Sequence, residues 1–151
     1  MSATRAEPTP RLFLDANVLV SGIAFRGPEA ELLGLAEQRR CEAVTCEYVL
    51  VQVERVLIRR LGLTEASVRE ALSCLPVRVV PDPPPSLVTR ASVPLRDPTD
   101  APVLAGAWEA QADALVSGDK DLLVLSAEQA DLPVLRTRAA LDLLRGIADN
   151  A

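Results

Sequence analysis

Short apolar blocks alternate along this chain with longer stretches in which apolar residues recur at helical spacing. Five compact apolar runs have the length of buried strands. They cover residues 11–15, 41–45, 77–80, 114–116 and 132–135. The stretches between and after them predict helices over residues 16–24, 29–40, 46–60, 64–75, 100–112 and from Thr137 through Ile147. This alternation predicts an α/β fold, with a five-stranded, mostly parallel sheet flanked by helices on both faces.

Polar, Gly and Pro residues mark where the predicted elements end. Thr45 is expected to cap the helix that follows it, and Gly62 is expected to end that helix. Residues 81–86 include four prolines and predict a surface loop, whereas residues 87–96 show no clear pattern. Residues 1–10 are polar and contain proline, so we expect a flexible tail before a single domain over residues 11–151.

The composition is that of a soluble globular protein. The 151 residues are 49% hydrophobic and 25% charged, and no apolar run approaches the roughly 20 residues of a membrane span. The N-terminal residues lack the apolar segment of a signal peptide. We therefore expect a cytoplasmic protein that does not bind membranes.

The chain contains no histidine, and its three cysteines lack the spacing of a zinc site. This composition argues against His/Cys zinc sites and against catalysis by Ser-His-Asp or Cys-His groups. Acid–base or metal chemistry must then use Asp, Glu, Lys, Tyr and water. The net charge of −5 argues weakly against binding nucleic acid through overall charge alone, although arginines could form a local basic patch.

Three aspartates lie where a predicted strand ends or a predicted helix begins. Asp15 closes the first strand, Asp100 opens a helix and Asp119 follows the fourth strand. In a parallel sheet these positions share the carboxyl edge, where such folds bind ligands. Carboxylates that gather there repel one another unless a cation joins them, and a hard divalent cation is the usual one.

Each acidic residue also has an ordinary structural interpretation. Asp15 and Asp100 could simply cap helices, and Asp119 could belong to a polar turn. Glu54 lies beside the apolar face of its predicted helix, where it is either an exposed neighbour of Arg55 or a group turned into a cleft. The metal-site hypothesis therefore depends on the group of residues and not on any one of them.

Four segments of the sequence resemble PIN-domain proteins, of the VapC-like group described as toxins of toxin–antitoxin pairs. The segments are residues 14–22 (LDANVLVSG), 54–57 (ERVL), 97–107 (DPTDAPVLAGA) and 112–123 (ADALVSGDKDLL). Their order and spacing match over nearly the whole chain after residue 10, and the last segment is the most specific. After Asp100 that group often has another acid, whereas this chain has Ala101.

The resemblance implies a metal-dependent ribonuclease that uses an acidic cluster. Carried over position by position, the family's catalytic carboxylates are Asp15, Glu54, Asp100 and Asp119. Asp15, Asp100 and Asp119 would bind Mg²⁺ or Mn²⁺, while Asn17, Ser117, Asp97 and Asp121 would support the site. The implied partners are an RNA substrate, a small antitoxin protein and further copies of the chain, in a homodimer or higher homo-oligomer.

Three other functions are compatible with parts of this pattern. A haloacid-dehalogenase phosphotransfer enzyme needs a second aspartate where this chain has Asn17, and a receiver domain needs an aspartate at the end of the third strand, which here ends in Val80 and Pro81. The more serious alternative is a catalytically weak or inactive PIN-like module that acts by binding RNA or protein. Aromatic residues make up only 3% of the chain, so broad stacking on bases is not expected.

Overall fold

A central parallel sheet organises the chain, as the sequence predicts. The structure is a computed structural model and describes residues 9–149, so most of the predicted N-terminal tail lies outside the described residues. The strands are β1 (Arg11–Leu14), β2 (Glu42–Cys46), β3 (Val77–Val80), β4 (Ala114–Val116) and β5 (Val134–Leu135). They pair in the order β3-β2-β1-β4-β5, and every pair is parallel. The strand β1 is therefore central, which places its end in the middle of the carboxyl edge.

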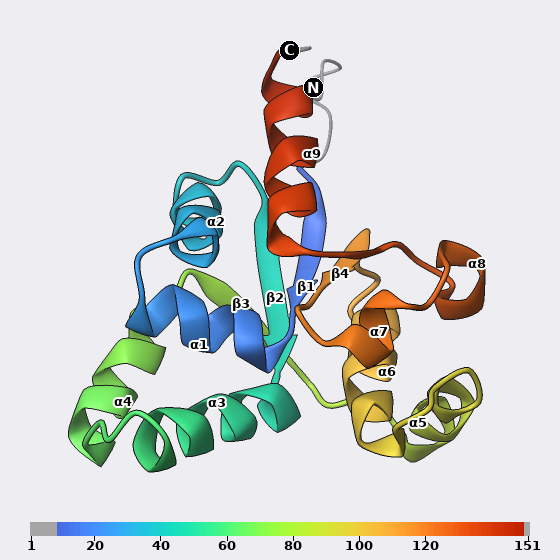
Figure 1. The fold of residues 1–151 in the computed structure, drawn as a ribbon, viewed down its shortest axis with the longest axis horizontal. Coiled ribbons are helices and arrows are strands. Elements are labelled where there is room, and N and C mark those ends of the chain that lie inside the picture. The colour runs from blue at the N-terminus through green and yellow to red at the C-terminus, as the bar shows by residue number, and fades with distance from the viewer. Residues whose placement is uncertain (1–8, 150–151) are drawn as a thin grey trace, which may run out of the picture.

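Helices cover both faces of the sheet. They are α1 (Ala16–Ala24), α2 (Pro28–Glu37), α3 (Glu47–Arg59), α4 (Glu65–Ser73), α5 (Pro85–Ser92), the 3₁₀ turn η1 (Pro98–Asp100), α6 (Ala101–Glu109), α7 (Lys120–Leu123), α8 (Ala127–Ala130) and α9 (Thr137–Asp149). Figure 1 shows α1 and α2 on one side of the sheet and α5 and α6 on the other. The predicted α/β fold is thus confirmed. Within residues 9–149, no helix combines the length and apolar character that crossing a membrane requires.

Some predicted boundaries were wrong. Thr45 belongs to β2, where its hydroxyl donates to the Leu14 carbonyl at 3.1 Å, and Cys46 is the residue that precedes α3. The predicted loop over residues 81–86 ends early, because α5 begins at Pro85. Proline suits the first turn of a helix, where its missing N–H has no intrahelical partner. Gly62 lies just after α3 with a φ of 71°, as expected of the residue that ends a helix.

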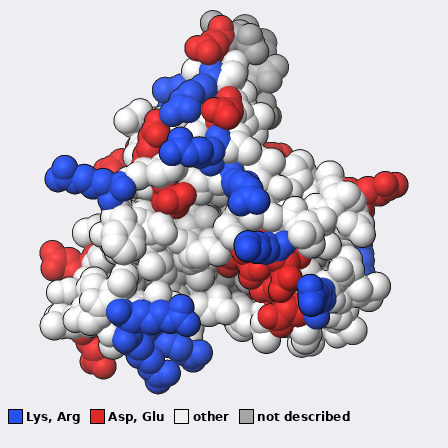
Figure 2. Space-filling view, viewed as in Figure 1, with Lys and Arg blue, Asp and Glu red and all other residues white. Residues whose placement is uncertain are grey.

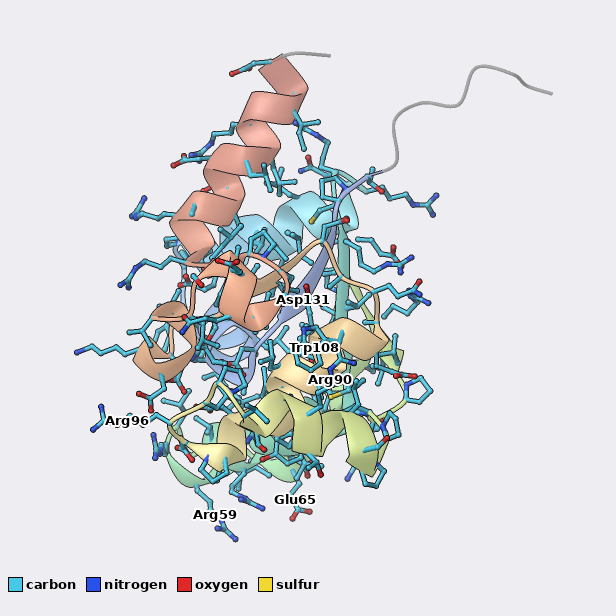
Figure 3. The ribbon with its side chains drawn as sticks, turned by 90° about the vertical axis from the view of Figure 1, so that its right-hand side faces the viewer. Arg59, Glu65, Arg90, Arg96, Trp108 and Asp131 are labelled. Atoms are coloured by element: carbon cyan, nitrogen blue, oxygen red, sulfur yellow. The ribbon has the colours of Figure 1, made fainter. Side chains whose placement is uncertain are left out.

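A cation–π contact joins the helices on the α5–α6 side. The Arg90 guanidinium of α5 lies 5.2 Å from the ring centroid of Trp108 in α6 (Figure 3). The Trp108 indole N–H donates to the Ala130 carbonyl at 2.7 Å, which ties α8 to α6. These contacts fasten the C-terminal part of α6 to α5 and α8.

Close packing between α6 and β1 gives a test of this core. A Cβ added at Gly106 would lie 2.8 Å from Cζ of Phe13, a fully buried side chain of β1. We expect Gly106→Ala to lower the free energy of unfolding by about 1–3 kcal/mol, because the ring must shift within a packed core. Gly34→Ala in α2 is the matched control, since no neighbour lies within 4 Å of its added Cβ. Gly34→Ala should raise the free energy of unfolding by about 0.5–1 kcal/mol. Denaturant unfolding would measure both, and equal effects would contradict the prediction.

Candidate metal-binding active site

The end of β1 places Asp15 inside the protein. Its backbone N–H donates to the Val116 carbonyl at 3.0 Å, so pairing with β4 continues one residue past the strand. Its side chain caps α1, with the Ala16 N–H donating to Oδ1 at 2.7 Å, and the residue is only 6% exposed. The capping role considered from the sequence is therefore real. It uses one carboxylate oxygen and leaves the other available for further contacts.

Ser117 joins the ends of β1 and β4 through its hydroxyl. The hydroxyl donates to Asp15 Oδ2 at 2.7 Å and accepts the Asp119 backbone N–H at 3.0 Å. Asn17 adds a second link, because its Oδ1 accepts the Gly118 N–H at 3.1 Å. Ser117 is fully buried. Asn17 and Ser117, which were predicted to support the site, thus hold the loop that carries Asp119 in place through these hydrogen bonds.

Asp119 begins α7 and orients the next acidic residue. Its Oδ1 accepts the Asp121 backbone N–H at 2.8 Å, the arrangement of a helix N-cap. Asp119 and Asp121 therefore come from a single turn of chain immediately after β4. The structure brings this turn to the same edge of the sheet as Asp15.

A second turn, at η1, positions Asp97 and Asp100. Asp97 Oδ1 accepts from the backbone N–H and the hydroxyl of Thr99, at 3.0 and 2.8 Å. The Tyr48 hydroxyl of α3 donates to the Thr99 carbonyl at 3.1 Å, which fixes this turn against α3. Asp100 is partly buried, and its Oδ2 is shielded from solvent without a hydrogen-bond partner within residues 9–149. A shielded carboxylate oxygen without a partner is costly, and a bound cation would satisfy it.

Burial, together with the crowding of these carboxylates, raises two pKa values. Burial, then the charges of Asp119 and Asp97, raise the pKa of Asp100 to about 7. Burial also raises the pKa of Asp15, although its hydrogen bond from Ser117 acts in the opposite direction. The ion pairs formed within residues 9–149 involve other residues, so no basic side chain in direct contact neutralises these carboxylates.

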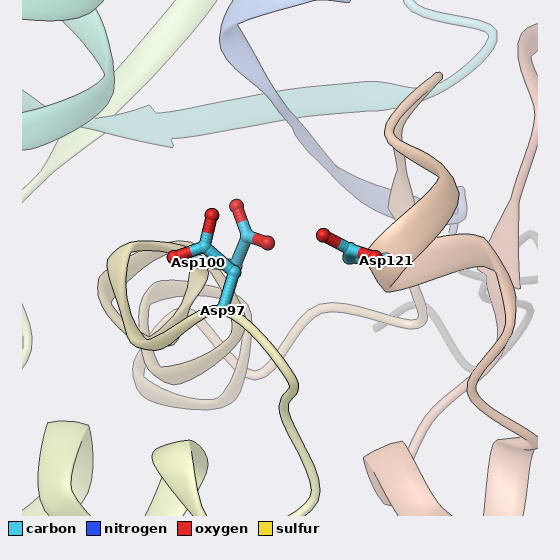
Figure 4. A group of neighbouring side chains, drawn as sticks. All are labelled: Asp97, Asp100 and Asp121. Carbon is cyan, nitrogen blue, oxygen red and sulfur yellow. The ribbon is translucent and has the colours of Figure 1, made fainter.

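Oxygen atoms of three acidic residues lie close enough to share one ion. Asp97, Asp100 and Asp121 each offer a carboxylate oxygen, and these oxygens lie within 4.8 Å of one another. Figure 4 shows Asp97 and Asp100 on one segment and Asp121 facing them from α7. An all-oxygen set of this kind suits Mg²⁺ or Mn²⁺. The residues present therefore fit a divalent metal.

Beside this group is an open cleft that three of the four predicted catalytic residues line. Asp15, Asp100 and Asp119 line the cleft, whose volume is about 530 Å³, together with Asn17. Figure 2 shows the acidic side chains gathered on one face with basic side chains near them. The structure thus brings together the predicted aspartates, and Asp100 belongs both to the cleft and to the group with Asp97 and Asp121.

Glu54 does not line this cleft. It is exposed and lines a separate hollow between α3 and α4, with Arg59 and Glu65. The α3 residues at the cleft are instead Gln52, Arg55 and Val56, and Arg60 follows them just beyond the helix. Gln52 and Arg60 were not among the site residues predicted from the sequence. Helical spacing could have found them, because positions 52, 56 and 60 lie four residues apart on one face.

Comparison with known proteins agrees with the fold. Residues 11–121 match the PIN domain family. No curated protein matched the sequence at a significant level. Among solved structures, PAE2754 from Pyrobaculum aerophilum is 20% identical, with a TM-score of 0.64 and coverage of 93% of this chain and 94% of that chain.

Two further solved structures are described as toxins or toxin complexes. VapC20 from Mycobacterium tuberculosis, a sarcin-ricin loop cleaving toxin, is 20% identical over 73% of this chain and 91% of its own, with a TM-score of 0.53. A toxin–antitoxin complex from Klebsiella pneumoniae is 19% identical over 83% of this chain and 97% of that chain, with a TM-score of 0.58. These similarities show a shared fold, and the family match covers most of the sequence. The chain therefore belongs to the PIN domain family.

Proposed function

We propose that this protein is a Mg²⁺- or Mn²⁺-dependent endoribonuclease and the toxin of a toxin–antitoxin pair. The observation that carries the proposal is the shielded Asp100 Oδ2, which has no hydrogen-bond partner within residues 9–149 and lies among other carboxylates. A site that keeps such a group ready for a cation, at the edge of a cleft, is suited to hydrolysis of phosphodiesters.

The side chains of the site fall into two groups, those that would bind a metal and those that hold the metal-binding residues in position. Asp15, Asp100 and Asp119 would bind the metal, with Asp97 and Asp121 beside them. A divalent ion held there would lower the pKa of water and stabilise charge on phosphate oxygens. Ser117 and Asn17 keep the carboxylates in position through the hydrogen bonds described above. The role predicted for Glu54 stays a prediction.

Two arginines support an anionic polymer as the substrate. Arg55 and Arg60 are exposed and line the same cleft as the aspartates. Guanidinium groups bind phosphate oxygens through paired hydrogen bonds, whereas a carboxylate cluster without a cation would repel a phosphate group. The arginines would therefore hold the RNA backbone while the acidic residues face the bond to be cut.

The named similarities support RNA as the substrate and a small protein as the regulator. VapC20 is described as cleaving the sarcin-ricin loop, and the Klebsiella pneumoniae structure as a toxin–antitoxin complex. We extend these properties to the present chain as part of the proposal, because the chain belongs to the PIN domain family and its aspartates gather at one edge of the sheet.

Incubation of the purified protein with a pool of structured RNA in Mn²⁺, Mg²⁺ or EDTA would test the proposal. We expect cleavage in at least one metal, none in EDTA, and a loss on the order of 100-fold or more in Asp119→Asn, because removing a metal ligand should exceed the effect of removing a supporting group. Asparagine can still cap α7, so the variant should fold. No cleavage by folded protein in either metal would favour the binding module, and cleavage that survives the substitution would indicate a contaminant.

A further inference from the structure

The helix α3 turns a neutral side chain, and not a carboxylate, toward the metal site. Gln52 lines the cleft together with Asp15, Asp100 and Asp119, and it is partly buried there. Glu54 is exposed and belongs to a different hollow. The sequence suggested that Glu54 would face the cleft from this helix, but the residue that faces it is Gln52, two positions earlier.

Helix geometry keeps the two side chains apart. Successive residues of an α-helix are separated by about 100° around its axis, so positions 52 and 54 differ by about 200°. Val53, which lies between them, is fully buried and fixes the rotation of α3 against the core. Val51 and Ile58 lie on the same face of α3 as Glu54. They line the same hollow, together with Arg55 and Arg59. Bringing Glu54 to the cleft would require turning Val53 out of the core.

The exchange of a carboxylate for an amide has a direct electrostatic consequence. An amide offers a metal or its water one neutral oxygen, whereas a carboxylate offers two oxygens and a negative charge. At this cleft α3 contributes an amide and the guanidinium of Arg55, so all the negative charge comes from other elements. The number of charged ligands is one of the main determinants of affinity for a hard divalent ion.

We propose that Gln52 is the residue through which α3 meets the metal site, and that its neutral amide keeps the site's affinity for Mg²⁺ and Mn²⁺ below that which a carboxylate at this position would give. Gln52 would act as a positioning residue, which lines the cleft that would hold the metal, and it would set the concentration of metal at which the site fills. This inference rests on the proposed metal-dependent function.

Calorimetric titration of Mn²⁺ into the folded, metal-free protein would test the inference without depending on cleavage. We expect Gln52→Glu to bind Mn²⁺ on the order of tenfold more tightly than the natural protein, because it adds a charged ligand of almost the same shape. Val51→Glu is the matched control: it adds the same charge at an exposed position of the other face and should leave the affinity unchanged. Glu54→Gln should also leave the affinity unchanged.

The outcomes separate this inference from the proposed function. Equal affinities for Gln52→Glu and the natural protein, or weaker binding by Glu54→Gln, would overturn the role of Gln52 while RNA cleavage by the natural protein stood. Equal tightening by Gln52→Glu and Val51→Glu would also overturn it, because a general charge effect would then suffice. Tighter Mn²⁺ binding by Gln52→Glu alone, with the natural protein and both other variants alike, would support it in full. Absence of both Mn²⁺ binding and RNA cleavage in every form would overturn the proposed function as well.

Discussion

Replacing Asp15 by asparagine is expected to lower metal-dependent RNA cleavage by a factor on the order of 100 or more without unfolding the protein. The substitution removes a negative charge from the cleft but keeps a side chain that can cap α1. In the natural protein the Ser117 hydroxyl donates to Asp15; in the variant the new amide can donate to that hydroxyl. Burial raises the pKa of Asp15, so removing this charge should leave the melting temperature of the metal-free protein unchanged or higher.

Cleavage assays and thermal unfolding of the metal-free protein would measure the two effects separately. Asp131→Asn is the matched control, since Asp131 is exposed, lies outside the cleft and has a φ of 57°, a conformation that asparagine adopts readily. It should change neither quantity. A large fall in the melting temperature of Asp15→Asn would show that Asp15 mainly stabilises the fold, and full activity in that variant would remove it from the site.

Cleavage and Mn²⁺ affinity are expected to rise steeply between pH 6 and pH 8. Asp100 has a pKa raised to about 7, chiefly by burial and then by the charge of Asp119. One pH unit below such a pKa about a tenth of the carboxyl groups are ionised, and one unit above it about nine tenths are. Since the metal binds the ionised form, affinity should increase through this range, with the apparent midpoint moving lower as metal is added.

The stability of the metal-free protein should change with pH in the opposite direction. Between the ordinary Asp pKa of 3.8 and about 7, folded Asp100 retains a proton that the unfolded chain has lost. The unfolded state then binds fewer protons, so this group's contribution to stability falls as pH rises through that window. Thermal unfolding from pH 5 to pH 8, with and without Mn²⁺, would measure the change. Asp100→Asn should flatten the metal-free profile, and an unaltered profile would contradict the assignment.

Much of the fold could be predicted because local and long-range requirements agree in this sequence. The apolar runs before Asp15 and before Ser117 are too short and too uniformly apolar for surface helices, and both form inner strands of the sheet, β1 and β4. In a parallel sheet the carboxyl ends of such strands share one edge, so the strand order alone predicted that Asp15 and Asp119 lie at the same edge.

The parts that could not be predicted depend on rotation and contact and not on periodicity. Glu54 and Gln52 both flank the apolar face of α3, and only the packing of Val53 decides which one reaches the cleft. Asp97 and Asp121 had no signal of their own beyond loop composition and were expected to support the site only through the family resemblance. The turn held by Thr99 and the start of α7 bring them close to Asp100. Such placements follow from tertiary contacts, which one sequence does not display.

The hydrogen bond between Ser117 and Asp15 joins residues that are 102 positions apart in the chain. During synthesis, the segment that carries Asp15 leaves the ribosome long before β4 exists. Any activity that needs this cluster is therefore absent from the growing polypeptide until the segment that carries Ser117 and Asp119 has emerged and folded beside β1.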